Sequence, residues 1–390
     1  MERNTPTHIS LTGENSHKIV IPPGQGSFSI GTKNISKGKY DVLVTADSTI
    51  NWDVFNEMYT PHGKQNTDRY PCGDWPRFFY YSGDDSGFIQ WSEKRRIESL
   101  NWSPISSLKA DFTKANIDTL TIHVGDNPIE LILGENILKL HLNGNINNIT
   151  IGASPGTTLV HFSPDADANT IYGLPNFPSL SNIATSIHLD NAIIGAAFDC
   201  ASLVQFKKMS SLNLRGNITN PQALAQLPNL EDLGLRTIPD LTGLPSLATW
   251  SKLKSFIGWN IEETKGKILQ QELKALLKEK EMEYSSVSKL RKKKWFTTEY
   301  GIPFTNWDGN NAKTATKAYK VALKEINKAK TEKDVKLAIV KLVQLINTLP
   351  NIETVEREDT GTAVEQLVAS SKLNLTQELA AQWFDEVRDF

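Results

Sequence analysis

The sequence predicts an α+β protein of several domains, with a β-rich N-terminal domain, a solenoid of stacked parallel strands and a C-terminal helical bundle. Three observations support this fold class. A short L-x-L phrase recurs in the middle of the chain, β-forming runs separated by turn residues come before it, and after it the apolar period lengthens from 2 to about 3.6 residues. The expected domains are 1–115, 116–260 and 261–390.

The first domain contains short runs of β-forming residues bounded by turn signals. We expect a small antiparallel sheet or sandwich that caps the open end of the solenoid, because a terminal repeat would otherwise expose its apolar face. Leu108, Ala110 and Phe112 would add one coil to the stack. The runs are HKIVI (17–21), SFSIG (27–31), YDVLVT (40–45), RFFYY (77–81) and FIQW (88–91).

The recurring phrase of the second domain is the most informative feature of the chain. Its copies start 18 to 27 residues apart, a period that is typical of stacked units sharing one core. Four copies carry a histidine, which we place at one common structural position. They are LTIHVGDN (120–127), LKLHLNGN (138–145), TLVHFSPD (158–165) and SIHLDNA (186–192). Copies without histidine follow at LNLRGN (212–217), at LGLRTI (233–238) and, in degenerate form, near Phe256.

The segments ILKLHLNGN (137–145) and MSSLNLRGN (209–217) follow the pattern L-x-x-L-x-L-x-x-N most closely. Over roughly residues 117 to 260, the chain therefore resembles the leucine-rich repeat family. The resemblance implies a curved stack of short parallel strands and a binding role. The stretch 322–364 also looks like a helical module that accompanies bacterial proteins of this family. That likeness implies a bacterial protein, with an immunity or adaptor factor that occupies a toxin or effector as one role.

Strand geometry separates core residues from surface residues within each copy. Successive side chains point to opposite faces of a strand, so Leu140 and Leu142 enter the core and His141 projects from the concave face. Arginine and tryptophan on the same face are the residue types most often found as binding anchors. The residues expected to bind a partner are His123, His141, His161, His188, Asp190, Asn213, Arg215, Arg236 and Trp259.

The histidine row has three interpretations. Neighbouring parallel strands stand about 4.8 Å apart, so the imidazoles could stack as neutral rings without any further role. They could instead contact a partner, or two of them could approach one metal ion. No carboxylate or cysteine is placed as a third ligand in the row, although Asp190 lies close to His188. We therefore predict no metal site. Because protonated neighbours repel, binding should weaken below about pH 6.5.

The third domain is predicted to be helical, with helices at 264–284, 312–330, 332–349, 362–370 and 375–387. Thr331 is a good N-cap, with Asp334 three residues later. The apolar face of the first helix consists of Ile268, Leu269, Leu273, Leu276 and Leu277.

Charge is segregated within this domain. Residues 289–341 hold fourteen Lys or Arg and five Asp or Glu, whereas residues 351–390 hold three and nine. Two helical hairpins of opposite charge could attract each other. The basic part could alternatively meet an acidic partner or a nucleic acid, since Trp295, Phe296 and Tyr300 flank the basic run.

These features favour a non-enzymatic protein-binding protein. The G-x-S-x-G match at 152–156 lacks the N–H that a nucleophile elbow needs, because Pro155 follows the serine. We predict no catalytic residues, no cofactor and no small-molecule substrate. A nucleic-acid partner is not expected, because the residues from 261 onward carry a net charge of only about +2. The start lacks an apolar signal region and no stretch could span a membrane, so a cytoplasmic location is expected.

The alternative is a secreted effector or enzyme whose solenoid selects the target while the N- or C-terminal domain acts. A deep cleft in the first domain lined by Asp53, His62, Asp74, Arg77 or Tyr80 would favour it.

Overall fold

The structure is a computed structural model that describes residues 6–21, 25–36, 40–60, 73–167, 169–191, 196–299, 301–307, 309–373 and 375–389. The chain forms two compact units that divide between Arg291 and Lys292. We call them the sheet unit and the helical unit. The expected boundaries at 115/116 and 260/261 both lie inside the sheet unit.

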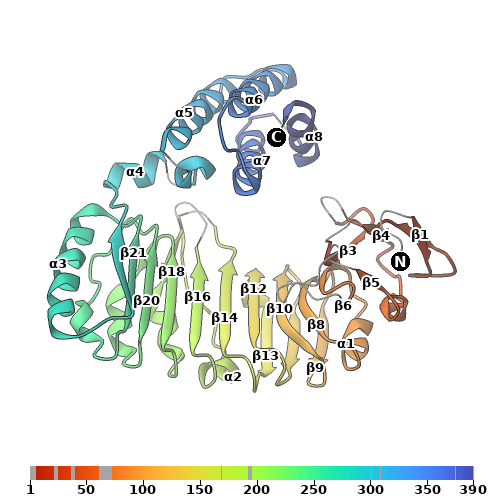
Figure 1. Cartoon of the computed structure of the whole chain (residues 1–390), viewed down its shortest axis with the longest axis horizontal. Coiled ribbons are helices and arrows are strands. Elements are labelled where there is room, and N and C mark those ends of the chain that lie inside the picture. The colour runs from red at the N-terminus through yellow and green to blue at the C-terminus, as the bar shows by residue number, and fades with distance from the viewer. Residues whose placement is uncertain are drawn as a thin grey trace. The chain divides into compact units, whose positions relative to one another are not determined.

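A single sheet of twelve strands runs through the sheet unit, and every neighbouring pair is parallel. Figure 1 shows the strands following one another along the sheet. The sheet runs in the order β22 (Tyr284–Ser288), β21 (Ser255–Trp259), β20 (Asp232–Arg236), β18 (Ser211–Arg215), β16 (Ser186–Asp190), β14 (Leu159–Pro164), β12 (Lys139–Gly144), β10 (Ile117–Val124), β8 (Ile97–Ser103), β7 (Phe78–Ser82), β3 (Ser27–Thr32) and β4 (Val42–Val44).

This sheet overturns the fold class expected from the sequence. The molecule is a mixed α/β protein with an all-parallel sheet plus helices, not a β-rich domain followed by a leucine-rich-repeat solenoid and a bundle. Strands β3, β4, β7 and β8 belong to the same parallel sheet as the strands of the recurring phrase, so they form no antiparallel cap. The turn residues between the N-terminal runs suggested hairpins. In the structure, residues 52–55 and 87–92, which lie between strands of this region, form short helices.

The run FIQW (88–91) was expected to be a strand, but it lies in a helix. Residues 87–92 form helix α1 (Gly87–Ser92) instead of a strand, with Phe88 and Trp91 buried. Within the described residues, antiparallel pairing is limited to two short pairs, β1 (Thr7–Ile9) with β2 (His17–Ile19) and β5 (Tyr59–Thr60) with β6 (Gly73–Asp74).

Short strands and single-turn helices connect the long strands. Leu108, Ala110 and Phe112, which were expected to add a coil to the stack, lie on a short strand that pairs with another connecting strand and not with the twelve-stranded sheet. Two small parallel sheets consist of β9 (Leu108–Phe112), β11 (Ile129–Leu133) and β13 (Ile149–Ala153), and of β15 (Ile171–Tyr172), β17 (Ala197–Asp199) and β19 (Ile218–Thr219). The helices are η1 (Trp52–Phe55), η2 (Ile146–Asn148), α2 (Pro178–Ser181), η3 (Cys200–Gln205), η4 (Pro221–Gln226) and η5 (Leu247–Thr249).

The core of the sheet unit lies between the twelve-stranded sheet and these connections. Leu140 and Leu142 of β12 and Leu131 of β11 are fully buried in it. Its composition changes along the chain. Near the N-terminus it is aromatic, with Phe88 and Trp102 packed edge-to-face at 5.0 Å between ring centroids. Along the recurring phrase it is mainly aliphatic.

Helix α3 (Glu263–Glu279) follows strand β21 and packs on the same core through Leu269, Leu273 and Leu276. The Glu262 side chain caps it by accepting hydrogen bonds from the backbone N–H groups of Thr264 and Lys265. The predicted helix 264–284 is too long, because residues 284–288 form β22. Ile268 and Leu277 were expected on the buried face but are exposed.

The helical unit has a separate core. Its helices are α4 (Lys293–Thr298), η6 (Pro303–Asn306), α5 (Gly309–Ile326), α6 (Glu332–Asn347), α7 (Thr354–Ala369) and α8 (Gln377–Val387). Thr331 and Asp334 form the expected capping box at the start of α6. Helix α7 begins eight residues before the predicted 362. No helix among the described residues is both long and apolar enough to cross a bilayer.

Candidate functional site

The candidate site is the outward face of the twelve-stranded sheet, formed by the side chains that alternate with the buried ones. On β12, for example, Leu140 and Leu142 are buried while His141 and Asn143 are half-buried. Strand register aligns these outward side chains into rows. The histidine row runs through Asn101, Thr121, His141, His161, His188, Asn213, Gly234, Ile257 and Ser286.

A second row lies two residues further along each strand, and we call it the arginine row. The pairs His123 with Asn143 and Asn143 with Ser163 begin it. At its other end, five residues on neighbouring strands pair one after another: Asp190, Arg215, Arg236, Trp259 and Ser288. The nine residues expected to bind a partner thus all lie in these two adjacent rows.

The expectation that four histidines share one position is wrong for His123. Thr121 is the partner of His141, whereas His123 pairs with Asn143 and belongs to the arginine row. The reason lies in the sequence LTIHV, where Leu120, Ile122 and Val124 are all buried and alternate with outward residues. Either pair of apolar residues can be aligned with Leu140 and Leu142, and the sequence alone does not decide between them.

The other three histidines form a continuous stack. The ring centroids of His141 and His161 are 5.2 Å apart, and those of His161 and His188 are 5.9 Å apart, both edge-to-face. Beyond them, the Asn213 amide nitrogen lies 3.3 Å from Nε2 of His188. Each ring therefore has a fixed neighbour on the next strand.

Burial keeps these imidazoles neutral. Desolvation lowers the pKa of His141 to about 4, and the nearby His161 and His188 contribute in the same direction. Desolvation also lowers the pKa of His188, with His161 and Arg236 adding to it. For His161 desolvation again dominates and lowers the pKa, although Asp190 opposes it. Any change in binding through this stack should therefore begin at a lower pH than the ordinary histidine value of about 6.5.

Asp190 joins the two rows electrostatically. Its Oδ2 accepts a hydrogen bond from Arg215 Nη1 at 3.1 Å, and its charge also acts on His161. Its Oδ1 is buried and has no hydrogen-bond donor among the described residues. The carboxylate is therefore oriented by Arg215 and can still accept a further hydrogen bond.

Asn191, which sequence analysis did not single out, holds the end of β16. Its side chain is fully buried, and Nδ2 donates to the carbonyl oxygens of Ala196 and Asn217, at 3.0 and 2.7 Å. The adjacent Gly216 has φ +93°, and a Cβ there would come within 2.0 Å of the Asn191 carbonyl oxygen. The tight fit fixes the position of Asp190, the residue before it. Its signal in the sequence was weak, because aligning Ile187 and Leu189 of SIHLDNA with the pattern L-x-x-L-x-L-x-x-N puts Ala192, and not Asn191, at the asparagine position.

The two arginines and the tryptophan that were expected as binding anchors lie together at one end of the arginine row. Arg215 and Arg236 are exposed, and Trp259 is half-buried. Register adds Tyr80 to the histidine row, since Tyr80 of β7 aligns with Asn101 and is 49% exposed; the sequence had suggested this residue only as part of a cleft. The outward face thus offers aromatic, imidazole and guanidinium groups over many strands.

Two of the residues that would have indicated an enzyme, Arg77 and Asp74, are engaged by oppositely charged side chains. Arg77 pairs with Glu98 at 2.7 Å, and Asp74 lies 3.7 Å from Arg95. His62 lies outside the described residues. Among those described, no group of three His, Cys, Asp or Glu side chains could hold a metal ion.

A groove of about 560 Å³ lies where β8, β10, β12 and β14 end. His123, Asn143 and Ser163 of the arginine row line it, together with Asp126 and Asp165. It extends the outward face as a polar hollow at the carboxyl ends of the strands.

Comparison with protein-family models, curated proteins and solved structures finds no match to this chain.

Proposed function

We propose that the sheet unit binds another protein across its outward face and performs no chemistry on it. The observation that carries this proposal is the pair of adjacent rows of partly exposed side chains on one face of a parallel sheet. Parallel sheets usually have both faces covered by helices. In the sheet unit, the buried residues of α1 and α3 join the core on the other side of the sheet.

The chemistry of the two rows suits a protein partner. Stacked neutral imidazoles, Trp259 and the arginines can contact both apolar and acidic groups. A nucleic acid would require many cations in line. Here the pairing of Arg215 with Asp190 and the placing of Asp232 on β20 make the local charge mixed.

The role as an immunity or adaptor protein for a bacterial toxin or effector is a further part of this proposal. It is supported only by the likeness of the stretch 322–364 to helical modules of bacterial proteins. The binding face itself does not depend on it.

The proposal can be tested by affinity capture with the intact chain and a triple variant, Arg215→Ala/Arg236→Ala/Trp259→Ala. The expected result is loss of the captured partner. Truncation of central anchor residues typically costs about 2 kcal/mol or more each.

The matched control changes two exposed lysines and one exposed apolar residue away from the outward face, as Lys207→Ala/Lys278→Ala/Ile171→Ala. This control should retain the partner. Equal capture by both triple variants would contradict the proposal, provided that both have the thermal stability of the unmodified protein.

A further inference from the structure

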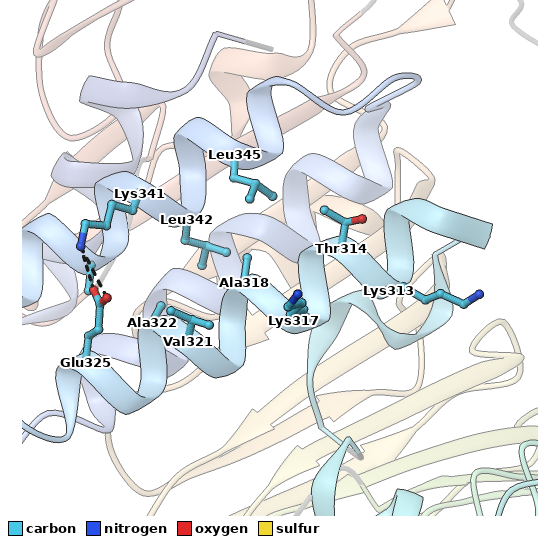
Figure 2. Close-up of a pocket in the computed structure, with 11 residues that line it drawn as sticks. Lys313, Thr314, Lys317, Ala318, Val321, Ala322, Glu325, Lys341, Leu342 and Leu345 are labelled. Atoms are coloured by element: carbon cyan, nitrogen blue, oxygen red, sulfur yellow. Dashed lines mark hydrogen bonds and ion pairs between the residues drawn. The ribbon is translucent and has the colours of Figure 1, made fainter.

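A second surface lies in the helical unit, in a groove between α5 and α6. The groove has a volume of about 470 Å³. Figure 2 shows side chains of the two helices facing each other across it. Its apolar floor consists of Ala318, Val321 and Ala322 from α5 with Leu342 and Leu345 from α6.

The spacing of α5 explains why a groove is present. Thr314, Ala318 and Ala322 follow one another at intervals of four residues, so one stripe of the helix carries only small side chains. The large residue Tyr319 lies off this stripe and is buried in the core, and Ile326, four residues after Ala322, ends the stripe of small side chains. Val321 beside the stripe is 51% exposed.

Positive charge lines the rim of this groove. Lys313, Lys317 and Lys341 line it together with one acidic residue, Glu325. Glu325 is already engaged by Lys341 at 3.2 Å, as the dashed lines in Figure 2 mark. The ion pairs found among the described residues of the helical unit include neither Lys313 nor Lys317. The groove therefore has an apolar floor and an uncompensated cationic rim at the start of α5.

We propose that this groove binds an amphipathic α-helix of a partner protein, with acidic side chains beside Lys313 and Lys317. An apolar stripe at i, i+3, i+4 and i+7 would lie on the alanine and leucine floor, as in other helix-in-groove complexes. The lining of α5 extends from Lys313 to Glu325. At 1.5 Å per residue this is about 18 Å, or about three turns of a bound helix.

The same observations disfavour a nucleic acid as the occupant. A phosphate backbone would gain nothing from an apolar floor. Of the aromatic residues beside the basic run, Tyr300 lies outside the described residues, and Trp295 and Phe296 pack against each other. Phe296 is buried, and the rings of Trp295 and Phe296 pack edge-to-face at 4.9 Å.

The test begins with an unbiased peptide selection on the intact protein. A displayed library of random 16-residue peptides is depleted on the Lys313→Glu/Lys317→Glu variant and then selected on the unmodified protein. We expect enriched peptides with apolar residues at helical spacing and a net negative charge. Enrichment of basic, proline-rich or non-periodic peptides would overturn the proposal.

Fluorescence anisotropy with an enriched peptide then locates the site. Lys313→Glu/Lys317→Glu and, separately, Val321→Asp should each weaken binding by about tenfold or more. The matched control, Lys333→Glu/Lys372→Glu, makes the same charge change at exposed lysines outside the groove and should stay within about twofold. Circular dichroism establishes that every variant is folded.

Three outcomes would overturn the proposal. The first is equal weakening by the two charge-reversal variants, which would indicate a general charge effect. In the second, hexadecanoate binds with the same dependence on Lys313 and Lys317 while no helical peptide is enriched, which would assign the groove to a fatty acid. The third is concentration-dependent dimerisation lost in Val321→Asp, which would make a second copy of this chain the occupant.

Discussion

The sheet unit and the helical unit differ in what they leave uncovered. The sheet unit presents imidazole, guanidinium and amide groups on one face of its sheet, and its stacked histidines have neighbours on adjacent strands. The helical unit presents an apolar groove with lysines at its rim. The first surface suits a broad, mixed contact, whereas the second suits one narrow amphipathic element. Two such different surfaces in one chain can engage two partners, or two parts of one partner.

The two cores should also respond independently to mutation. Phe162 and Trp383 are both buried, each in the core of its own unit. Phe162→Ala should destabilise the sheet unit by about 3–5 kcal/mol and leave the helical unit unchanged, and Trp383→Ala should do the reverse. Hydrogen exchange measured by mass spectrometry during urea unfolding separates the two. Loss of protection in both units from either variant would contradict two independent cores.

Asn191 tests the sheet unit alone and should have a smaller effect. Asn191→Ala removes two donors from buried backbone carbonyl groups, so we expect a loss of about 1–3 kcal/mol. Asn143→Ala is the matched control, because its side chain is half-buried in the arginine row, and it should cost less than about 0.5 kcal/mol. Equal thermal stability of the two variants would show that the Asn191 amide does not hold the end of β16.

The histidine stack predicts a pH dependence that the helical unit should not share. His141 has a pKa of about 4 when folded and an ordinary value of 6.5 when unfolded. Between these values the unfolded chain binds the proton more tightly, so the stability of the sheet unit should fall as the pH drops from 6.5 toward 4. NMR titration of His141 should give a midpoint near 4, and His141→Gln should reduce the loss of stability. A midpoint at or above 6.5 would contradict the burial argument.

The repeat part of the fold was the most predictable. The alternation of apolar and polar residues around His141, Leu214 and Leu235 correctly predicted which side chains of these strands are buried and which point outward. It failed at His123, where three consecutive alternate positions are apolar and two alignments satisfy the same pattern. The recurring phrase has two alternate apolar positions, whereas this strand has three. Alternation alone therefore cannot decide which two of the three align with the neighbouring strand.

The N-terminal region and the groove were not predictable for a different reason. Short β-forming runs do not reveal whether they pair in parallel, because the partner strand is distant in sequence. The run at 88–91 is helical since Phe88 and Trp91 reach the core from one side of a helical turn. The groove depends on how α5 packs against α6, and the sequence of either helix alone gives only an amphipathic pattern.

Site-specific photo-crosslinking tests the central claim about the outward face most directly. Benzoylphenylalanine is placed at Asn213 or at Ile257, both in the histidine row, and at Ile171, which is 69% exposed on β15 of a small sheet. After irradiation in a native lysate, we predict that positions 213 and 257 both form an adduct with the same protein and that position 171 does not. An adduct of that protein from position 171 alone, or equally from all three positions, would contradict binding through the outward face.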